Sequence, residues 1–214
     1  MDDSSHGIVL LQIVSGLVLS PPISRHRLHE FIRGKPVRFG YKDWMLCSSD
    51  GFCYSFDTYC GAKPSSVQAP TKIKTSLPLG SRVVLVFAKI IDAPSDHVLF
   101  FDNYFASHDL LNALRKIGIR ATGTVHDNRT KKCPLVPVKT IKKKRRPWND
   151  NSAVTMATNY DSVEPLAQIK RWSSKRKEKM PVPQPQLFKN YNYRMGGVDL
   201  LDQGVNNYRI AIHG

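Results

Sequence analysis

Two short acidic motifs carry the residues of this chain whose types and spacing could do chemistry. Residues 100–105 read FFDNYF and set Asp102 at the end of an apolar run, while residues 195–203 read MGGVDLLDQ and set Asp199 and Asp202 three positions apart. Carboxylates are the hard oxygen ligands that Mg²⁺ prefers, and two ions about 4 Å apart can hold the attacking and leaving oxygens of a phosphodiester. Converging at the edge of a buried sheet, these three side chains would supply a magnesium-dependent phosphoryl-transfer site.

The elements around Asp102 are predicted from the spacing of apolar residues. Residues 97–101 are typical of a buried strand that ends at Asp102, where ligands commonly meet a sheet. Over residues 81–91 the apolar spacing predicts a helix that Ser81 caps and that ends at residues 92–94, although the Val and Ile content leaves a buried strand as the alternative.

A second helix is predicted after Asp102. Ser107 is expected to cap it and Gly118 to end it, and a strand over residues 119–125 follows. The apolar residues expected on the inner face of this helix are Leu110, Leu111, Leu114 and Ile117. A strand, a helix and a strand in succession imply a crossover, and therefore a sheet with some parallel pairing.

Glycines mark two further elements. Residues 35–60 alternate apolar and polar positions around Asp50 and Gly51, a dipeptide that tolerates positive φ and predicts a hairpin, and a Pro- and Ser-rich loop is expected over residues 61–78. Gly196 and Gly197 allow a tight start to a helix on which Asp199 and Asp202 would share a face. Taken alone, these carboxylates would as readily be caps, and Asp102 an Asx turn.

Six ordered segments resemble the piggyBac transposase family, in particular the domesticated piggyBac transposable element-derived proteins. They are FIRGKPVRFGYKDW at 31–44, DGFCYSFDTYCG at 50–61, FDNYFASHDLL at 101–111, GTVHDNR at 123–129, WNDNS at 148–152 and YRMGGVDLLD at 193–202. The resemblance covers residues 30–214 and implies an α/β fold of the RNase H-like, DDE transposase type, incomplete here. It also implies Mg²⁺- or Mn²⁺-dependent DNA cleavage and strand transfer, with Asp102 as the second metal-binding aspartate, Asp199 as the third and Asp202 as its acidic neighbour.

One part of the family's pattern is missing. The first metal-binding aspartate of the family belongs to an Ile-Asp-Glu motif upstream of residues 33–36, and this chain has no such motif there. The only aspartates in that region are Asp2 and Asp3, within a segment (residues 1–29) that does not resemble the family. Removing one of three ligands weakens a hard-cation site and spoils its geometry.

Three functions remain open at this point. We expect a domesticated, transposase-derived nuclear DNA-binding protein whose metal site is incomplete and inactive. The first alternative is an active Mg²⁺-dependent strand-transferase in which Asp43, Asp50 or Asp57 replaces the missing ligand. The second is a truncated product without independent activity. The oligomeric state is left open, with a homodimer as one option.

The charge of the chain favours a polyanionic partner. Its 32 Lys and Arg against 17 Asp and Glu give a formal net charge of +15, and each neutralised phosphate releases counterions. Membranes and acidic proteins would satisfy the same charge, and the resemblance favours DNA. Basic loops are expected at residues 131–147 and 170–180, as phosphate contacts or nuclear import signals. The candidate phosphate-contacting residues are Lys142, Lys143, Lys144, Arg145, Arg146, Lys170, Arg171, Lys175, Arg176 and Lys177.

Two tryptophans lie beside the basic segments. We expect Trp148 and Trp172 to anchor these segments to the core, and the alternative is that they stack on unpaired bases. No sequence feature resembles a zinc finger or a homeodomain helix, so phosphate contacts are expected to dominate over base readout.

The amino-terminal segment and the cysteines point away from secretion. Residues 8–19 are apolar but too short for a bilayer, which takes about 20 residues, and acidic rather than basic residues precede them. A signal-like segment stays an alternative to a non-family amino terminus. The four cysteines, at 47, 53, 60 and 133, lack zinc-ligand spacing and are predicted to be reduced thiols of an intracellular protein. No membrane partner is expected.

Overall fold

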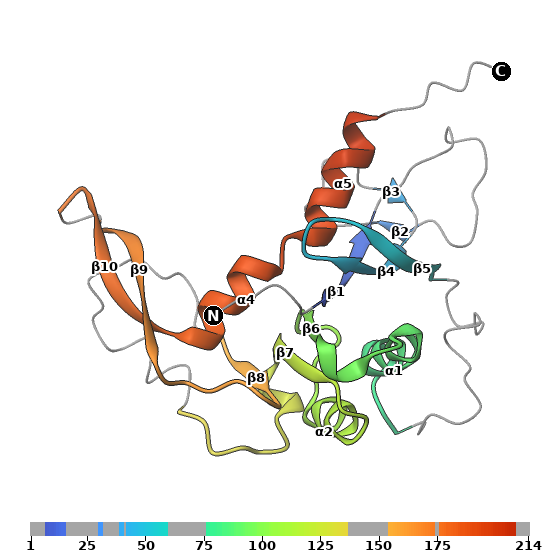
Figure 1. Cartoon of the computed structure of the whole chain (residues 1–214), viewed down its shortest axis with the longest axis horizontal. Helices are drawn as coiled ribbons and strands as arrows, with labels where there is room; N and C mark the ends of the chain where they lie inside the picture. Colours follow the sequence, from blue (N-terminus) through green and yellow to red (C-terminus); the bar gives the residue numbers. More distant parts are fainter. Residues whose placement is uncertain are drawn as a thin grey trace.

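A six-stranded mixed sheet forms the centre of the molecule (Figure 1). The computed structural model describes residues 7–15, 30–31, 39–40, 42–59, 76–136, 154–173 and 176–208. In spatial order the strands are β5 (Cys53–Thr58), β4 (Lys42–Ser48), β1 (Gly7–Ser15), β6 (His97–Phe101), β7 (Arg120–Thr124) and β8 (Met156–Thr158). The pairs among β1, β6 and β7 are parallel, and the other pairs are antiparallel. The expected α/β class and its parallel crossover are confirmed.

The apolar run near the amino terminus becomes an interior strand of this sheet. β1 pairs antiparallel with β4 and parallel with β6, so both of its edges are hydrogen-bonded. A continuous apolar run suits a strand covered on both faces. Among the described residues, no helix has the length and apolar character that a membrane crossing needs.

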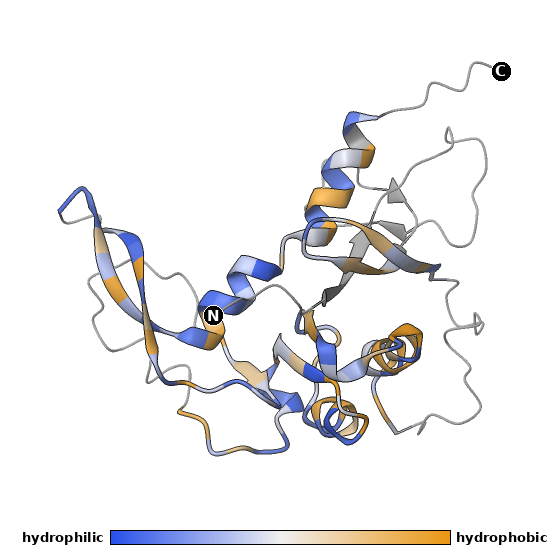
Figure 2. Cartoon of the chain, viewed as in Figure 1, coloured by the Kyte–Doolittle hydropathy of each residue, from blue (hydrophilic) through white to orange (hydrophobic). Residues whose placement is uncertain are grey.

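One face of the sheet is covered by α1 (Leu79–Phe87) and α2 (His108–Lys116), with short 3₁₀ turns at Ala88–Ile90, Pro94–Asp96 and Asp127–Arg129. α1 is mostly hydrophobic (Figure 2), with Ser81 and Arg82 as its polar residues. The residues that form this core include Val83, Phe87, Leu99, Phe101, Phe105, Leu110 and Leu114, all buried. This layer fixes the strand that leads to Asp102.

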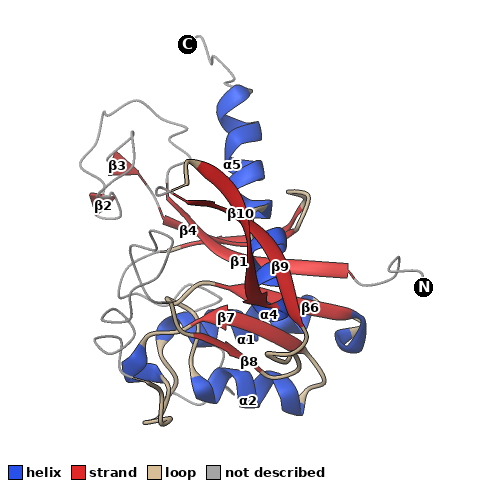
Figure 3. Ribbon diagram, turned by 90° about the vertical axis from the view of Figure 1, so that its left-hand side faces the viewer, coloured by secondary structure: helices blue, strands red, loops and turns tan. Residues whose placement is uncertain are grey.

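The other face carries α4 (Gln186–Arg194) and α5 (Gly197–Asn207), and α5 rises away from α1 and α2 in both views (Figure 1 and Figure 3). Met195 packs with Val98 and Phe100 of β6. Only three residues later, Val198 packs with Met45 and Cys47 of β4. The chain therefore crosses the sheet from β6 to β4 at the junction of the two helices.

Two small antiparallel ribbons complete the described structure. One joins β2 (Glu30–Phe31) to β3 (Phe39–Gly40), and the other joins β9 (Leu166–Ser173) to β10 (Glu178–Pro185). The β9–β10 hairpin stands apart from the six-stranded sheet in Figure 1, and its tip is hydrophilic (Figure 2).

Several predicted elements are confirmed. The strand at 97–101 has the predicted bounds, Ser107 caps α2 by accepting the Leu110 N–H at 3.2 Å, and Gly118 follows α2 with φ of 80°. Asp50 and Gly51 form the turn between β4 and β5, with φ of 95° at Gly51. Most of the predicted loop at 61–78 lies outside the described residues.

Three details of the prediction are wrong. Ser81 does not cap α1, which starts earlier at Leu79 behind Pro78; instead the Ser81 hydroxyl donates to the Phe105 carbonyl oxygen at 2.7 Å. The α-helix ends at Phe87 and continues only as a 3₁₀ turn to Ile90. Ile117 is 49% exposed, because α2 ends one residue before it and its side chain leaves the inner face.

The cysteines are free thiols where the structure describes them. Cys47 is buried, Cys53 is half-buried and Cys133 is exposed, while Cys60 lies outside the described residues. Burial raises the pKa of the Cys47 thiol to about 12, so this side chain is a neutral part of the core.

Candidate functional site around Asp102

Asp102 directly follows β6, near the carboxyl end of the parallel strand β7, while β1 continues past Phe101 to Ser15. Two glycines let the neighbouring elements approach this segment closely. A Cβ on Gly123 of β7 would come within 2.5 Å of the Phe101 ring, and a Cβ on Gly80 of α1 would come within 2.5 Å of the Tyr104 carbonyl oxygen. Because both glycines lack a side chain, β7 packs directly against Phe101 and α1 packs directly against Tyr104. These two contacts fix the backbone before and after Asp102.

The Asp102 carboxylate is half-buried, and its surroundings contain groups that raise its pKa and groups that lower it. Burial is the largest influence and raises the pKa above the ordinary value of an aspartate. The backbone N–H groups of Tyr104 and Phe105 and electrostatic interactions with His126 and Arg129 oppose it; the Tyr104 N–H donates to Oδ1 at 2.9 Å. The carboxylate is thus partly desolvated and interacts with the Arg129 guanidinium.

Arg129 holds the loop that follows Asp102. Its Nη1 donates to the carbonyl oxygens of Asn103 at 3.1 Å and Tyr104 at 2.5 Å. The residue sits in the 3₁₀ turn Asp127–Arg129, just after β7. A guanidinium bound to two consecutive carbonyls limits the positions that the Asp102 backbone can adopt.

Tyr191 of α4 closes the site from the other face of the sheet. Its hydroxyl donates to the Phe101 carbonyl oxygen at 3.4 Å, and its ring lies 6.3 Å from the Phe100 ring, centroid to centroid. Burial raises the pKa of Tyr191; a hydrogen bond with Thr124 opposes this, and the charge of Asp102 adds to it. The phenol is therefore neutral and close to Asp102.

Asp199 and Asp202 occupy the start of α5. Val198 and Leu201 pack this helix onto Met45 and Cys47, while Asp199 is exposed and Asp202 is half-buried. Within the part of the chain that the structure describes, no group of three or more His, Cys, Asp or Glu could hold a metal ion. The assignment of a metal to Asp102, Asp199 and Asp202 stays a prediction.

The aspartates considered as replacement ligands have local roles. Asp43 is buried and accepts the Thr58 hydroxyl at 2.6 Å. Asp50 is exposed in the β4–β5 turn, where a hydrogen bond from Ser48 lowers its pKa. Asp57 is half-buried on β5, the outermost strand of the sheet on that side.

The register of β1 identifies the residue that stands next to Asp102. Leu11 is paired with Phe101, so the next position on β1 is Gln12 and the next on β6 is Asp102. β1 also lies upstream of residues 33–36, the part of the chain where the resemblance expects the first aspartate. The residue at this register position of the neighbouring strand is therefore a glutamine.

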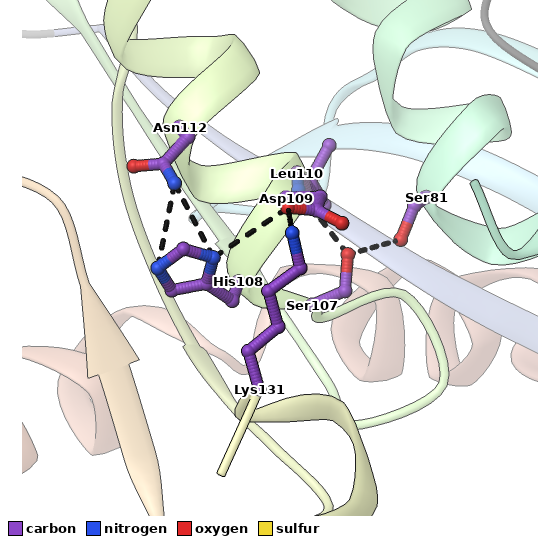
Figure 4. Close-up of polar contacts among 7 residues, drawn as sticks. All are labelled: Ser81, Ser107, His108, Asp109, Leu110, Asn112 and Lys131. Carbon is purple, nitrogen blue, oxygen red and sulfur yellow. Dashed lines mark hydrogen bonds and ion pairs between the residues drawn. The ribbon is translucent and has the colours of Figure 1, made fainter. Parts of the chain in front are cut away.

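A separate polar cluster lies at the start of α2 (Figure 4). Lys131 Nζ is 2.5 Å from the Asp109 carboxylate, which lowers the pKa of Asp109, and the Ser81 and Ser107 hydroxyls are 2.9 Å apart. The cluster contains one carboxylate and caps the helix, so its role is structural.

The candidate phosphate-contacting residues are only partly described. Residues 142–146 and Lys175 lie outside the described residues. Lys170, Arg176 and Lys177 are exposed on the β9–β10 hairpin and Arg171 is half-buried. The expectation that Trp172 anchors this segment is wrong, because 57% of its surface is exposed. Trp148 lies outside the described residues.

Comparison with known proteins places the chain in a family. A family model described as Transposase IS4 matches residues 16–214, beginning inside the segment that we treated as separate from the family. The chain belongs to this transposase family, in its piggyBac branch. It is 36% identical over 211 residues to human piggyBac transposable element-derived protein 3, covering 91% of this chain and 35% of that protein. Human piggyBac transposable element-derived protein 2 is also 36% identical, over 203 residues, covering 85% of this chain and 33% of that relative.

A solved structure shares the fold. A piggyBac transposase synaptic complex with hairpin DNA, determined by cryo-EM, aligns with a TM-score of 0.63 and 20% identity over 92% of this chain and 40% of that one. The chain spans about a third of the length of the two human relatives named above.

The sequence predicted that Asp102 follows a buried strand, which is confirmed, but it did not predict the side chains that surround Asp102. His126 and Arg129 lie in a segment that carried the family resemblance, which could have drawn attention to them, although nothing in their spacing indicated contact with a carboxylate. No sequence signal marked Tyr191.

Proposed function

We propose that this chain is a transposase-derived, nuclear DNA-binding protein whose metal-dependent phosphoryl-transfer site is incomplete. In this proposal the six-stranded sheet is an RNase H-like core, Asp102 and Asp199 are remnants of its catalytic aspartates, and Asp202 is their acidic neighbour. Basic residues outside that site hold the DNA backbone.

The observation that carries this proposal is the register of β1 beside β6. Gln12 stands next to Asp102, where a third acidic ligand would complete a hard-cation site. A neutral amide oxygen binds Mg²⁺ or Mn²⁺ less well than a carboxylate, and catalysis needs the full ligand set in the right geometry. The residues present therefore fit a divalent cation only in part.

DNA binding is supported by charge rather than by the carboxylates. The net charge is +15, and the exposed Lys170, Arg176 and Lys177 lie on a hairpin that stands apart from the six-stranded sheet (Figure 1). A relative of the same fold was solved as a complex with DNA. Each phosphate contact adds its own counterion release, so binding does not require a complete metal site.

A salt titration tests the DNA-binding part. Duplex DNA affinity is measured for the wild type and for a triple variant that combines Lys142→Gln, Lys144→Gln and Arg146→Gln. A control triple variant loses the same charge at exposed positions after α1 and at the end of α2, namely Lys89→Gln, Arg115→Gln and Lys116→Gln. If Lys142, Lys144 and Arg146 each contact a phosphate, the slope of log affinity against log salt falls in magnitude by roughly 2.7 in the first variant, at about 0.9 for each contact. The control should keep the wild-type slope. Equal slopes in all three proteins would contradict the assignment.

Thermal unfolding with Mn²⁺ tests the metal part. A ligand that binds only the native state raises its midpoint, so a chain without a working site should unfold cooperatively at one temperature with and without Mn²⁺ in near-UV circular dichroism. An upward shift that Asp102→Asn removes would instead favour an active strand-transferase.

A further inference from the structure

The β9–β10 hairpin presents one face on which cations lie beside flat apolar groups. Cross-strand partners point to the same face of a ribbon, and three of the pairs on one face are Trp172 with Lys179, Lys170 with Pro181, and Gln168 with Pro183. All six residues are exposed, and we call them the outer face. The positions on the opposite face that are buried are Ala167, Ser173, Val182 and Gln184.

The spacing on the outer face puts two ammonium groups near one indole. Side chains directly opposite each other have Cβ atoms roughly 4.5–5.5 Å apart, which applies to Trp172 and Lys179. Lys170 is two residues from Trp172 along β9, or about 7 Å. Within the described hairpin residues, 166–173 and 176–185, the one carboxylate is Glu178, which pairs with Ser173 on the other face and lies 4.0 Å from Arg176. Among the described hairpin residues, the outer face therefore carries two lysines and no carboxylate.

The free edge of the hairpin is closed to another strand. Pro181, Pro183 and Pro185 alternate along β10, and a proline has no N–H to donate. Their nitrogens must point away from β9, because the ladder needs donors on its inner side. The outer edge of β10 thus lacks donors at alternate positions, which blocks the addition of a peptide strand. A partner must use the face and not this edge.

We propose that the outer face binds an unpaired nucleic-acid strand, with a base stacked on the Trp172 indole and phosphates held by Lys170 and Lys179. Proteins hold single strands without reading sequence by combining aromatic platforms with cationic tracks. The bases of a duplex are stacked on one another and offer no free face to the indole except at the ends. This inference rests on the proposed DNA binding and adds the kind of strand that this surface takes.

Fluorescence anisotropy of the full chain tests the inference. The probe is a labelled single strand of about 16 nucleotides, the upper site size of one single-strand-binding domain, compared with the same sequence as a duplex. The variants are Trp172→Ala, Trp172→Phe and the control Phe56→Ala, which removes an aromatic side chain that is 66% exposed on β5. Trp172→Ala should weaken single-strand binding about 5- to 150-fold, with little change for duplex. Trp172→Phe and the control should bind nearly as well as the wild type.

A salt titration tests the contribution of the two lysines apart from that of Trp172. Lys170→Gln combined with Lys179→Gln should lower the slope for the single strand by roughly 1.4, at about 0.7 for each phosphate, whereas Trp172→Ala should leave the slope unchanged. An unchanged slope in the double lysine variant would overturn the assignment of phosphates to these residues.

The outcomes separate this inference from the proposed function. A wild-type chain that binds neither probe contradicts DNA binding itself. A wild type that binds duplex, with Trp172→Ala matching the Phe56→Ala control on the single strand, overturns only the inference. Binding of poly-glutamate with the same dependence on Trp172 would make the outer face a docking surface for acidic peptides and would also overturn it. Thermal unfolding of each variant shows that the compared proteins are folded.

Discussion

Gly123 has a direct effect on the position of Asp102, and its replacement by alanine tests the central part of the fold. Gly123 pairs with Phe101 in the parallel register of β6 and β7. A Cβ at this position would lie 2.5 Å from the Phe101 ring and 2.7 Å from the Phe101 carbonyl oxygen, where 3.4–4 Å is ordinary contact. Phe101 is fully buried in the core beneath α1 and α2, and the carbonyl belongs to the strand backbone. The contact with the carbonyl oxygen cannot be relieved without moving the backbone of β6 or β7.

The expected cost follows from this geometry. Overpacking a core costs up to about 3 kcal/mol, and Gly123→Ala should reach that value because one clash involves backbone. In a chain of this size each kcal/mol shifts the melting temperature by roughly 2–4 °C, so the midpoint should fall by about 6–12 °C. Adding Phe101→Leu should restore only part of the loss, since the carbonyl contact remains.

Gly204 provides a matched control. It lies inside α5, and a Cβ there would meet no atom within 4 Å. Gly204→Ala should therefore stabilise the helix by roughly 0.5–1 kcal/mol. Thermal unfolding followed by circular dichroism compares both variants with the wild type. A Gly123→Ala protein that melts at or above the wild-type temperature would show that β6 and β7 do not pair in this register, and the placement of Asp102 would be wrong.

Three further predictions concern the same region. Burial raises the folded-state pKa of Asp102, so the folded protein loses stability as the pH rises from the ordinary aspartate pKa through the folded pKa. Asp102→Asn, which cannot ionise, should therefore be more stable than the wild type in melts at pH 7 but not at pH 3. An equal difference at both pH values would contradict this prediction. Ser107→Ala should cost about 1 kcal/mol in urea unfolding through loss of the α2 cap, while Ser107→Thr should cost less; equal losses would argue against the cap. Gln12→Asp should place a carboxylate next to Asp102, so that Mn²⁺ raises the melting temperature of this variant and not of Gln12→Asn; no response to Mn²⁺ would count against the β1 register.

The elements that could be predicted from the sequence are those specified by local chemistry. The strand at 97–101 has an apolar run that stops at a charged residue, and α2 has both a serine cap and a glycine stop. The position of β1 could not be predicted, because an apolar run favours a buried strand but does not indicate which strands pair with it. Its two partners begin 35 and 90 residues after it starts, at Lys42 and His97, and only the assembled sheet brings them together.

The same distinction applies to the site. Asp102 could be predicted because the strand ahead of it ends there, whereas Tyr191 meets the Phe101 carbonyl across 90 positions of sequence. No sequence pattern around a single tyrosine in a helix indicates such a contact. The exposure of Trp172 was missed for a related reason: alternation along β9 shows that two faces differ but not which of them is covered.

In our proposal, DNA binding can be kept after catalysis is lost, because the metal ligands and the exposed cations lie on different elements. A metal site depends on every ligand at once, since one neutral residue in place of a carboxylate changes both charge and geometry. Phosphate contacts contribute one by one, and losing a few lowers affinity in steps. Here the position next to Asp102 comes from β1, while the exposed cations Lys170 and Lys179 come from a hairpin that makes no strand pair with the main sheet. A change confined to the first strand therefore removes the catalytic ligand set and leaves the cationic surface as it was.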